Sequence, residues 1–264
     1  MPIREVLESY SHIDLTQDEI DTALVEAKRK KELVLEQQAL SLQAEQNRKA
    51  FTSRHYSYDQ TYGMMLFRAG NLFQGEFKLD KNNQTVFELL CLYFAYDPKF
   101  VPTALAMGVQ GPSLDKGILL AGNFGVGKTW LMQLFARNQL QVFAVHNAKS
   151  IADLFERDGS ESQGQFIDPP KLPVNDAQNF YHKVIGLCID DMGTEREKNH
   201  YGNKKSVVGD LIELRYAKGA AGHLFHITTN LNAAQITEAY GGRVSSRLRE
   251  IMNIIQLTGN DRRI

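Results

Sequence analysis

The sequence of 264 residues contains little cysteine, no long apolar run and almost no net charge, and each shortage excludes a class of protein. Its two cysteines, Cys91 and Cys188, lie within apolar runs, which excludes a disulfide scaffold and indicates a reduced protein with buried thiols. No stretch approaches the roughly 18 apolar residues of a membrane-spanning helix, and the N-terminal residues contain no apolar export signal. We therefore expect a soluble, cytoplasmic protein without membrane contact.

The charge balance limits how the chain can meet nucleic acid. The formal net charge is -1, and the seven histidines show no zinc-binding spacing. A nucleic-acid contact would therefore depend on a local basic patch rather than on the field of the whole molecule. The hydrophobic content of 43% and the length suit one sizeable core, alone or with a small appendage.

The N-terminal part differs from the rest in its pattern. Thr16 to Glu19 matches a capping box and predicts a helix from about residue 17 to about residue 50, without proline or glycine to end it. Its apolar stripe is broken by the basic run at 28–31, so the helix either packs on the remainder of the chain or docks on a partner. Residues 51–81 are predicted to be an irregular aromatic-rich connector, and a capping box at Thr85 to Glu88 predicts an apolar helix that ends before Pro98.

From Lys116 onward, short apolar runs alternate with helical patterns. Such alternation predicts a parallel sheet covered on both faces by helices, a three-layer α/β sandwich. Residues 158–173 are predicted to form a surface loop because they are rich in glycine, serine and proline. The predicted strands are 117–122, 141–145, 184–190, 223–229 and 253–258, and the predicted helices are 128–138, 148–156, 203–218 and 232–240.

The stretch GNFGVGKT matches the phosphate-binding consensus GxxxxGK[ST] at each fixed position and stands between a predicted strand and a predicted helix. Its glycines allow successive backbone amides to point at phosphates, Lys128 supplies a positive charge, and the Thr129 hydroxyl is a ligand for Mg²⁺. We predict a site for ATP and Mg²⁺. The nucleotide-binding set is Gly122, Asn123, Phe124, Gly125, Val126, Gly127, Lys128, Thr129 and Trp130, with packing as the favoured alternative for Trp130.

Polar side chains end two of the predicted strands. Asp190 and Asp191 follow the run VIGLCI, where the first would hold Mg²⁺ and the second would orient or deprotonate a water molecule. Asn230 follows HITT and would lie between these carboxylates and the terminal phosphate, although an asparagine in that place is also a common turn or cap.

Four motifs, GNFGVGKT, IDDMGTE, HITTN and GGRVSSRLRE, together resemble the AAA+ ATPases of the DnaC-type helicase-loader family, to which the transposition helper IstB is closely related. The resemblance covers roughly residue 116 to the C-terminus. It implies a P-loop AAA+ domain with a five-stranded parallel sheet and no full C-terminal lid domain. It also implies a Walker A motif at 122–129, a Walker B motif at Asp190 and Asp191, and a sensor residue at Asn230.

The same resemblance assigns arginines. It implies that Arg247, which forms an i, i+4 pair with Arg243, is an arginine finger that reaches the ATP of a neighbouring subunit. A planar, permanently charged guanidinium suits the charge of a transferred phosphoryl group, while a solvated basic helix end is the alternative. Arg263 is implied to be a sensor-2-like residue, although Asp261 replaces the serine of the family's final motif. Arg243 and Arg263 complete the predicted nucleotide-binding set.

The resulting domain division is a helical partner-binding region at 1–60, a connector with a lead-in helix at 61–115, and an AAA+ ATPase domain at 116–264. The resemblance implies a DnaC-like helicase loader that hydrolyses ATP at subunit interfaces, self-associates, engages a replicative helicase and contacts single-stranded DNA. Tyr201, Lys204 and Lys205 are the candidate DNA contacts, with a solvated loop as the alternative.

Three other functions are weighed against the loader. An IstB-like helper of a DNA transposase fits the same ATPase motifs, so only the partner of the N-terminal region separates the two. A P-loop nucleotide kinase is disfavoured because no acceptor site follows the Walker B motif. An ATP-gated scaffold that does not hydrolyse ATP remains open, and substitution of Asp191 tests it.

Overall fold

The computed structural model describes residues 16, 18, 21–22, 24–35, 56–138, 141–159, 162, 164–168, 171–176, 179–195, 198–200, 203–219 and 224–262. The chain divides into two compact units, Met1–Arg54 and His55–Ile264. In the first unit residues 24–35 are helical, in agreement with the helix predicted there, and the predicted continuation over 36–50 lies outside the described residues. No helix in the described ranges is long and apolar enough to cross a membrane.

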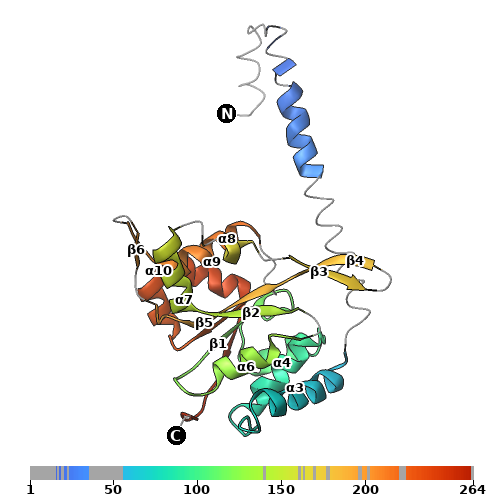
Figure 1. Cartoon of the computed structure of the whole chain (residues 1–264), viewed down its shortest axis with the longest axis vertical. Helices are drawn as coiled ribbons and strands as arrows, with labels where there is room; N and C mark the ends of the chain where they lie inside the picture. The colour runs from blue at the N-terminus through green and yellow to red at the C-terminus, as the bar shows by residue number, and fades with distance from the viewer. Residues whose placement is uncertain are drawn as a thin grey trace, which may run out of the picture. The chain divides into compact units, whose positions relative to one another are not determined.

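The second unit is built on a five-stranded parallel sheet with the strand order β2-β5-β8-β1-β9. Strands β1, β2 and β5 of this sheet are labelled in Figure 1. Strand β1 therefore lies between β8 and β9, which are the last two strands in the sequence. All five strands were predicted with boundaries within about two residues. The five strands are β1 Gly117–Ala121, β2 Phe143–Asn147, β5 Gly186–Met192, β8 Phe225–Thr229 and β9 Met252–Gln256.

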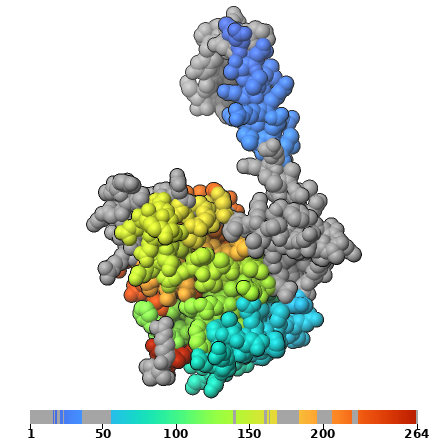
Figure 2. All heavy atoms as spheres, in the orientation of Figure 1, coloured from blue at the N-terminus to red at the C-terminus, as the bar shows by residue number. Residues whose placement is uncertain are grey.

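Alternate side chains of β1 pack into two separate cores, one on each face of the sheet. Ile118 and Leu120 belong to a core shared with α3, α4, α5 and α6, whereas Leu119 and Ala121 belong to a core shared with α7, α9 and α10. Figure 2 shows the cyan atoms of α3 beside the teal and green atoms of the segments that follow it in the chain. The helices are α3 Tyr58–Leu72, α4 Gln84–Phe94, α5 Phe100–Ala106, α6 Lys128–Phe135, α7 Ala148–Asp158, α8 Gly164–Ile167, α9 Val207–Ala217 and α10 Ala233–Ile251.

The predicted α/β fold class is confirmed: helices pack on both faces of a five-stranded parallel sheet and form a three-layer sandwich. A parallel sheet buried on both faces explains why its strands are almost entirely apolar. Cys91 and Cys188 are buried free thiols, as predicted, and burial raises the pKa of each.

Three local predictions are corrected. Residues 58–72, predicted to be irregular, form α3, which starts at a complete capping box between Ser57 and Gln60. Helix α4 begins at the N-cap Asn83, and Thr85 lies inside the helix instead of capping it. The predicted loop at 158–173 contains α8 and the start of a hairpin. Two antiparallel hairpins lie outside the main sheet: β3 Lys171–Asp176 with β4 Asn179–Val184, and β6 Lys198–His200 with β7 Asn203–Lys205.

Candidate nucleotide-binding site

The loop between β1 and α6 has the backbone shape that its glycines predict. Gly125 and Gly127 have φ angles of 72° and 98°, in the left-handed region that favours glycine. Gly127 is the N-cap of α6 and has no side chain with which to cap it. The first amides of α6 and the positive end of its dipole are therefore suited to an anion.

Lys128 is 5% exposed, and its ammonium group lies against its own loop. Nζ donates hydrogen bonds to the carbonyl oxygens of Gly122 (2.9 Å) and Asn123 (2.8 Å). It also donates to Oδ1 of Asn230 at 2.5 Å, a contact that joins positions 102 apart in the sequence. The structure thus brings the loop lysine and the predicted strand-end asparagine into direct contact.

Asp190 and Thr129 meet on the other side of the loop. The Thr129 hydroxyl lies 3.0 Å from both carboxylate oxygens of Asp190, and the Thr228 hydroxyl donates to Oδ1 of Asp190 at 2.6 Å. Burial raises the pKa of the Asp190 carboxyl, against the two hydroxyl hydrogen bonds and the charge of Lys128, which lower it. Thr228 was missed in the sequence analysis, and the available signal was a polar residue inside an apolar strand.

A bulge in the pairing of β5 with β8 separates the roles of the two aspartates. The register shifts between Ile189 and Met192, and Asp191 has a φ angle of 56°, which is uncommon for a residue other than glycine. The Asp191 amide donates to the Thr228 hydroxyl at 2.8 Å. Thr228 therefore fixes the side chain of Asp190 and the backbone of Asp191 together.

The residues present fit a magnesium ion held together with phosphate. Among the residues that the structure describes, no group of three or more His, Cys, Asp or Glu side chains forms a metal cluster. Mg²⁺ at phosphate sites usually takes one or two protein oxygens and completes its shell with phosphate and water. The adjacent oxygens of Thr129 and Asp190 provide such a pair, and the buried carboxylate gains from a nearby cation.

Two members of the predicted nucleotide-binding set have other surroundings. Trp130 stacks on Phe73 with ring centroids 4.5 Å apart and an angle of 8° between the ring planes. This contact agrees with the alternative in which Trp130 packs within the protein. Phe124, at the tip of the loop, is 64% exposed.

Arg247 contacts α9 of its own chain. Its Nη1 lies 3.4 Å from Oε2 of Glu213, and its guanidinium carbon lies 4.6 Å from the centroid of the Tyr216 ring. Arg243 approaches the same carboxylate at 3.5 Å but is 73% exposed. Gly241, with φ 84°, kinks α10 just before these arginines. The i, i+4 spacing therefore places both on one face of α10, against α9.

Several predicted residues lie partly or wholly outside the described part of the chain. Arg263 and Tyr201 are outside it, and for Lys204 and Lys205 only their place in β7 is described. Their predicted roles remain predictions.

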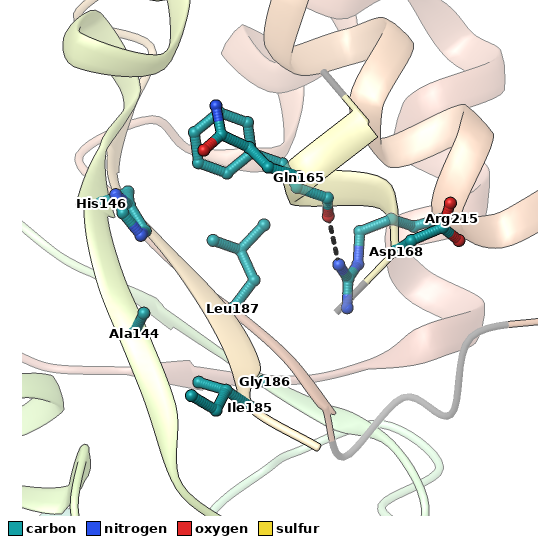
Figure 3. A pocket seen from close by; sticks show the side chains of 9 residues that line it. Ala144, His146, Gln165, Asp168, Ile185, Gly186, Leu187 and Arg215 are labelled. Carbon is teal, nitrogen blue, oxygen red and sulfur yellow. Dashed lines mark hydrogen bonds between the residues drawn. The ribbon is translucent and has the colours of Figure 1, made fainter. Parts of the chain in front are cut away.

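A separate hollow of about 200 Å³ lies beside β2, β5, α8 and α9 (Figure 3). Its wall includes Arg215, which is 1% exposed and donates to the carbonyl oxygens of Phe166 and Leu224. The Arg215 guanidinium also lies 4.8 Å from the ring centroid of Phe225, and burial lowers its pKa to about 10. These contacts tie α8 and α9 to the start of β8, so Arg215 has a structural role and the hollow is separate from the phosphate loop.

No protein-family model matches the chain, and no curated protein matches it. Among solved structures, AMPPCP-bound DnaA from Aquifex aeolicus has a TM-score of 0.41 and 16% identity, over 71% of this chain and 50% of that chain. Domain III of the Thermotoga maritima replication initiation protein DnaA has a TM-score of 0.41 and 16% identity, over 69% of this chain and 65% of that chain. The chain thus spans less than two thirds of either structure.

Proposed function

We propose that the chain is an ATPase that binds ATP with Mg²⁺ at the carboxyl edge of its sheet. The observation behind this proposal is the convergence of four side chains from three strand ends, namely Lys128 and Thr129 after β1, Asp190 in β5 and Asn230 after β8. Ligands of parallel α/β sheets bind outside the carboxyl ends of the strands, at the point where the strand order reverses.

The contacts of Lys128 suggest how the site accepts a nucleotide. The ammonium donates to two loop carbonyls and to Asn230. A bound triphosphate would replace the carbonyls of Gly122 and Asn123 as partners of Nζ, while Asn230 keeps the lysine aligned. The backbone amides of the loop and the start of α6 would bind the remaining phosphate oxygens.

Hydrolysis adds three roles to this binding site. Asp190 and Thr129 would hold Mg²⁺, which neutralises charge on the phosphates. Asp191 would orient or deprotonate the attacking water. Arg247 would act as a finger on the nucleotide of a neighbouring subunit, for which it would leave Glu213 and Tyr216; this role rests on the resemblance of the arginine segment.

The biological role that we propose is that of a DnaC-like helicase loader in DNA replication. The support is the resemblance of four motifs in order and spacing, and the same motifs suit an IstB-like transposase helper. A replicative helicase, single-stranded DNA and further copies of the chain are the proposed partners. The basic run at residues 28–31, on the N-terminal helix, is the place to test which partner binds.

The ATPase proposal is tested with purified full-length protein. Lys128→Ala is expected to lose nucleotide binding, and Asp191→Asn to keep binding but lose hydrolysis. Arg157→Ala, which removes an exposed ion pair with Asp158, is the matched control and should hydrolyse ATP normally. Unchanged turnover in Asp191→Asn would instead favour the scaffold that does not hydrolyse ATP.

The partner is tested by capture with ATP, using the full chain and a variant in which residues 28–31 are alanines. Recovery of a hexameric helicase that depends on these residues supports the loader. Recovery of a transposase supports the alternative. Capture of either partner with equal yield by both proteins would contradict a docking role for the basic run.

A further inference from the structure

The segment that follows β9 runs back along the outside of the phosphate-binding loop. The Leu257 amide donates to the carbonyl oxygen of Ala121 at 2.8 Å, which continues the pairing with β1. A Cβ atom on Gly122 would lie 2.1 Å from the Leu257 carbonyl oxygen, and one on Gly125 would lie 1.8 Å from Oδ1 of Asp261. Glycine at 122 is thus required by the backbone of the returning segment, whereas glycine at 125 is required by the φ of the loop, with the Asp261 side chain packed against it.

Arg262 makes three contacts at the end of this segment. Its backbone amide donates to the carbonyl oxygen of Gly125 at 3.0 Å, and its Nε donates to the carbonyl oxygen of Val126 at 3.2 Å. Its Nη2 donates to Asp80 at 2.9 Å. The side chain of Arg262 is 28% exposed, so water competes only partly for these bonds.

Asp80 is a fixed partner for this arginine. Its Oδ1 accepts hydrogen bonds from the backbone amides of Asn82 (2.8 Å) and Asn83 (3.2 Å) in the turn before α4. The hydrogen bond from Arg262 lowers the pKa of the Asp80 carboxyl, so the carboxylate is ionised at neutral pH. Arg262 therefore connects the phosphate loop to the turn that starts α4.

The two loop carbonyls determine where two loop amides point. In a trans peptide the C=O and the N–H of the same unit point in opposite directions. When Arg262 binds the carbonyls of Gly125 and Val126, the amides of Val126 and Gly127 therefore point away from Arg262. Backbone amides are the groups with which such a loop binds phosphate.

We propose that Arg262 is a positioning residue for nucleotide binding, which holds two successive loop amides toward the phosphates through the Arg262–Asp80 brace. The inference rests on the proposed nucleotide site but does not require hydrolysis or a neighbouring subunit. It assigns a role to Arg262, whereas the resemblance of the C-terminal motif pointed to the next residue, Arg263.

The test is direct titration of the full-length protein with ADP and ATP, read by calorimetry. Arg262→Ala removes the bonds to Val126 and Asp80 and is expected to weaken binding of both nucleotides about tenfold, because the loop must then be ordered when nucleotide binds. The kcat at saturating ATP should change less than KM, because the brace orders the binding loop and touches no reacting atom. The exposed variant Arg157→Ala is the control and should bind like the wild type.

A conservative variant and a double-mutant cycle separate positioning from charge. Arg262→Lys keeps the charge, but its single ammonium group cannot replace the separate Nε and Nη2 donors that bind Val126 and Asp80. This variant should therefore bind nucleotide more weakly than the wild type. Arg262→Gln and Asp80→Asn should be non-additive when combined. Wild-type affinity in Arg262→Ala or in Arg262→Lys would overturn the brace. Failure of the wild type itself to bind nucleotide would instead overturn the proposed function.

Discussion

Replacing Asn230 with aspartate should make the phosphate-loop lysine less available to nucleotide. The Lys128 ammonium donates to the Asn230 amide oxygen at 2.5 Å, and the lysine is 5% exposed. Asn230→Asp keeps the size of the side chain but turns this neutral acceptor into a carboxylate. The lysine then has an ionic partner from which the phosphates must remove it.

The size of the effect follows from the change of acceptor. The bond from the Lys128 ammonium already has one charged partner, and a carboxylate acceptor adds the attraction between two charges, about 1 kcal/mol for a pair in a watery environment. The substitution should therefore stabilise the free chain by about 1 kcal/mol, which raises Tm by about 2–4 °C for a domain of this size. Nucleotide binding should weaken at least about tenfold, since about 1.4 kcal/mol corresponds to a factor of ten. The new carboxylate also repels the phosphates.

The assay combines thermal unfolding without nucleotide with calorimetric titration of ADP. Asn230→Ala is the matched comparison, because it removes the acceptor without adding charge. It should lower Tm, leave ADP affinity within about threefold of the wild type and reduce ATP turnover. If Asn230→Asp binds ADP as tightly as Asn230→Ala, the contact between Lys128 and Asn230 does not control access to the lysine and the reasoning is wrong.

The remaining predictions concern the proposed metal ligand Asp190, the loop glycine and the core. Because burial raises the pKa of Asp190, its carboxyl keeps a proton at higher pH than an ordinary aspartate, so stability of the free chain should fall as pH rises through the raised pKa. Mg²⁺-dependent nucleotide binding should show the opposite trend and weaken as pH falls through the same range, measured by titration with and without Mg²⁺. Gly125→Ala should lower both Tm and nucleotide affinity, because alanine at a φ of 72° is strained and its methyl group would meet Asp261. Phe94→Ala should cost about 3–5 kcal/mol in denaturant unfolding, because Phe94 is 2% exposed and packs against Phe135 and Phe143.

The sheet and much of the candidate site could be predicted because each rests on local pattern. Buried parallel strands are apolar on both faces, so each strand of the sheet appears as a short uninterrupted run. Polar residues that follow such runs meet at one edge of a parallel sheet. The contact of Lys128 with Asn230 and that of Thr129 with Asp190 are in line with this rule.

The misses have physical causes of different kinds. Helix α3 has apolar side chains on its exposed side, including Phe67 at 75% exposure, so its periodicity is weak, although the capping box at Ser57 was available as a signal. Thr228 looks like an ordinary strand residue until the bulge in β5 is known. The bond from Arg262 to Val126 joins positions 136 apart, and neither residue belongs to a pattern that would associate them.

The strand order also determines when the proposed nucleotide site can form during synthesis. Strand β1 has no neighbour in the sheet until β8 and β9 are made, and the bond between Ile118 and His226 closes a separation of 108 positions. Long-range pairing of this kind is slow and comes late in folding. A nascent chain that has emerged only as far as α9 contains the whole phosphate-binding motif. It still lacks β8 and β9, the two strands that flank β1, and it also lacks Asn230 and Arg262. Nucleotide binding would therefore distinguish a completed chain from a truncated one.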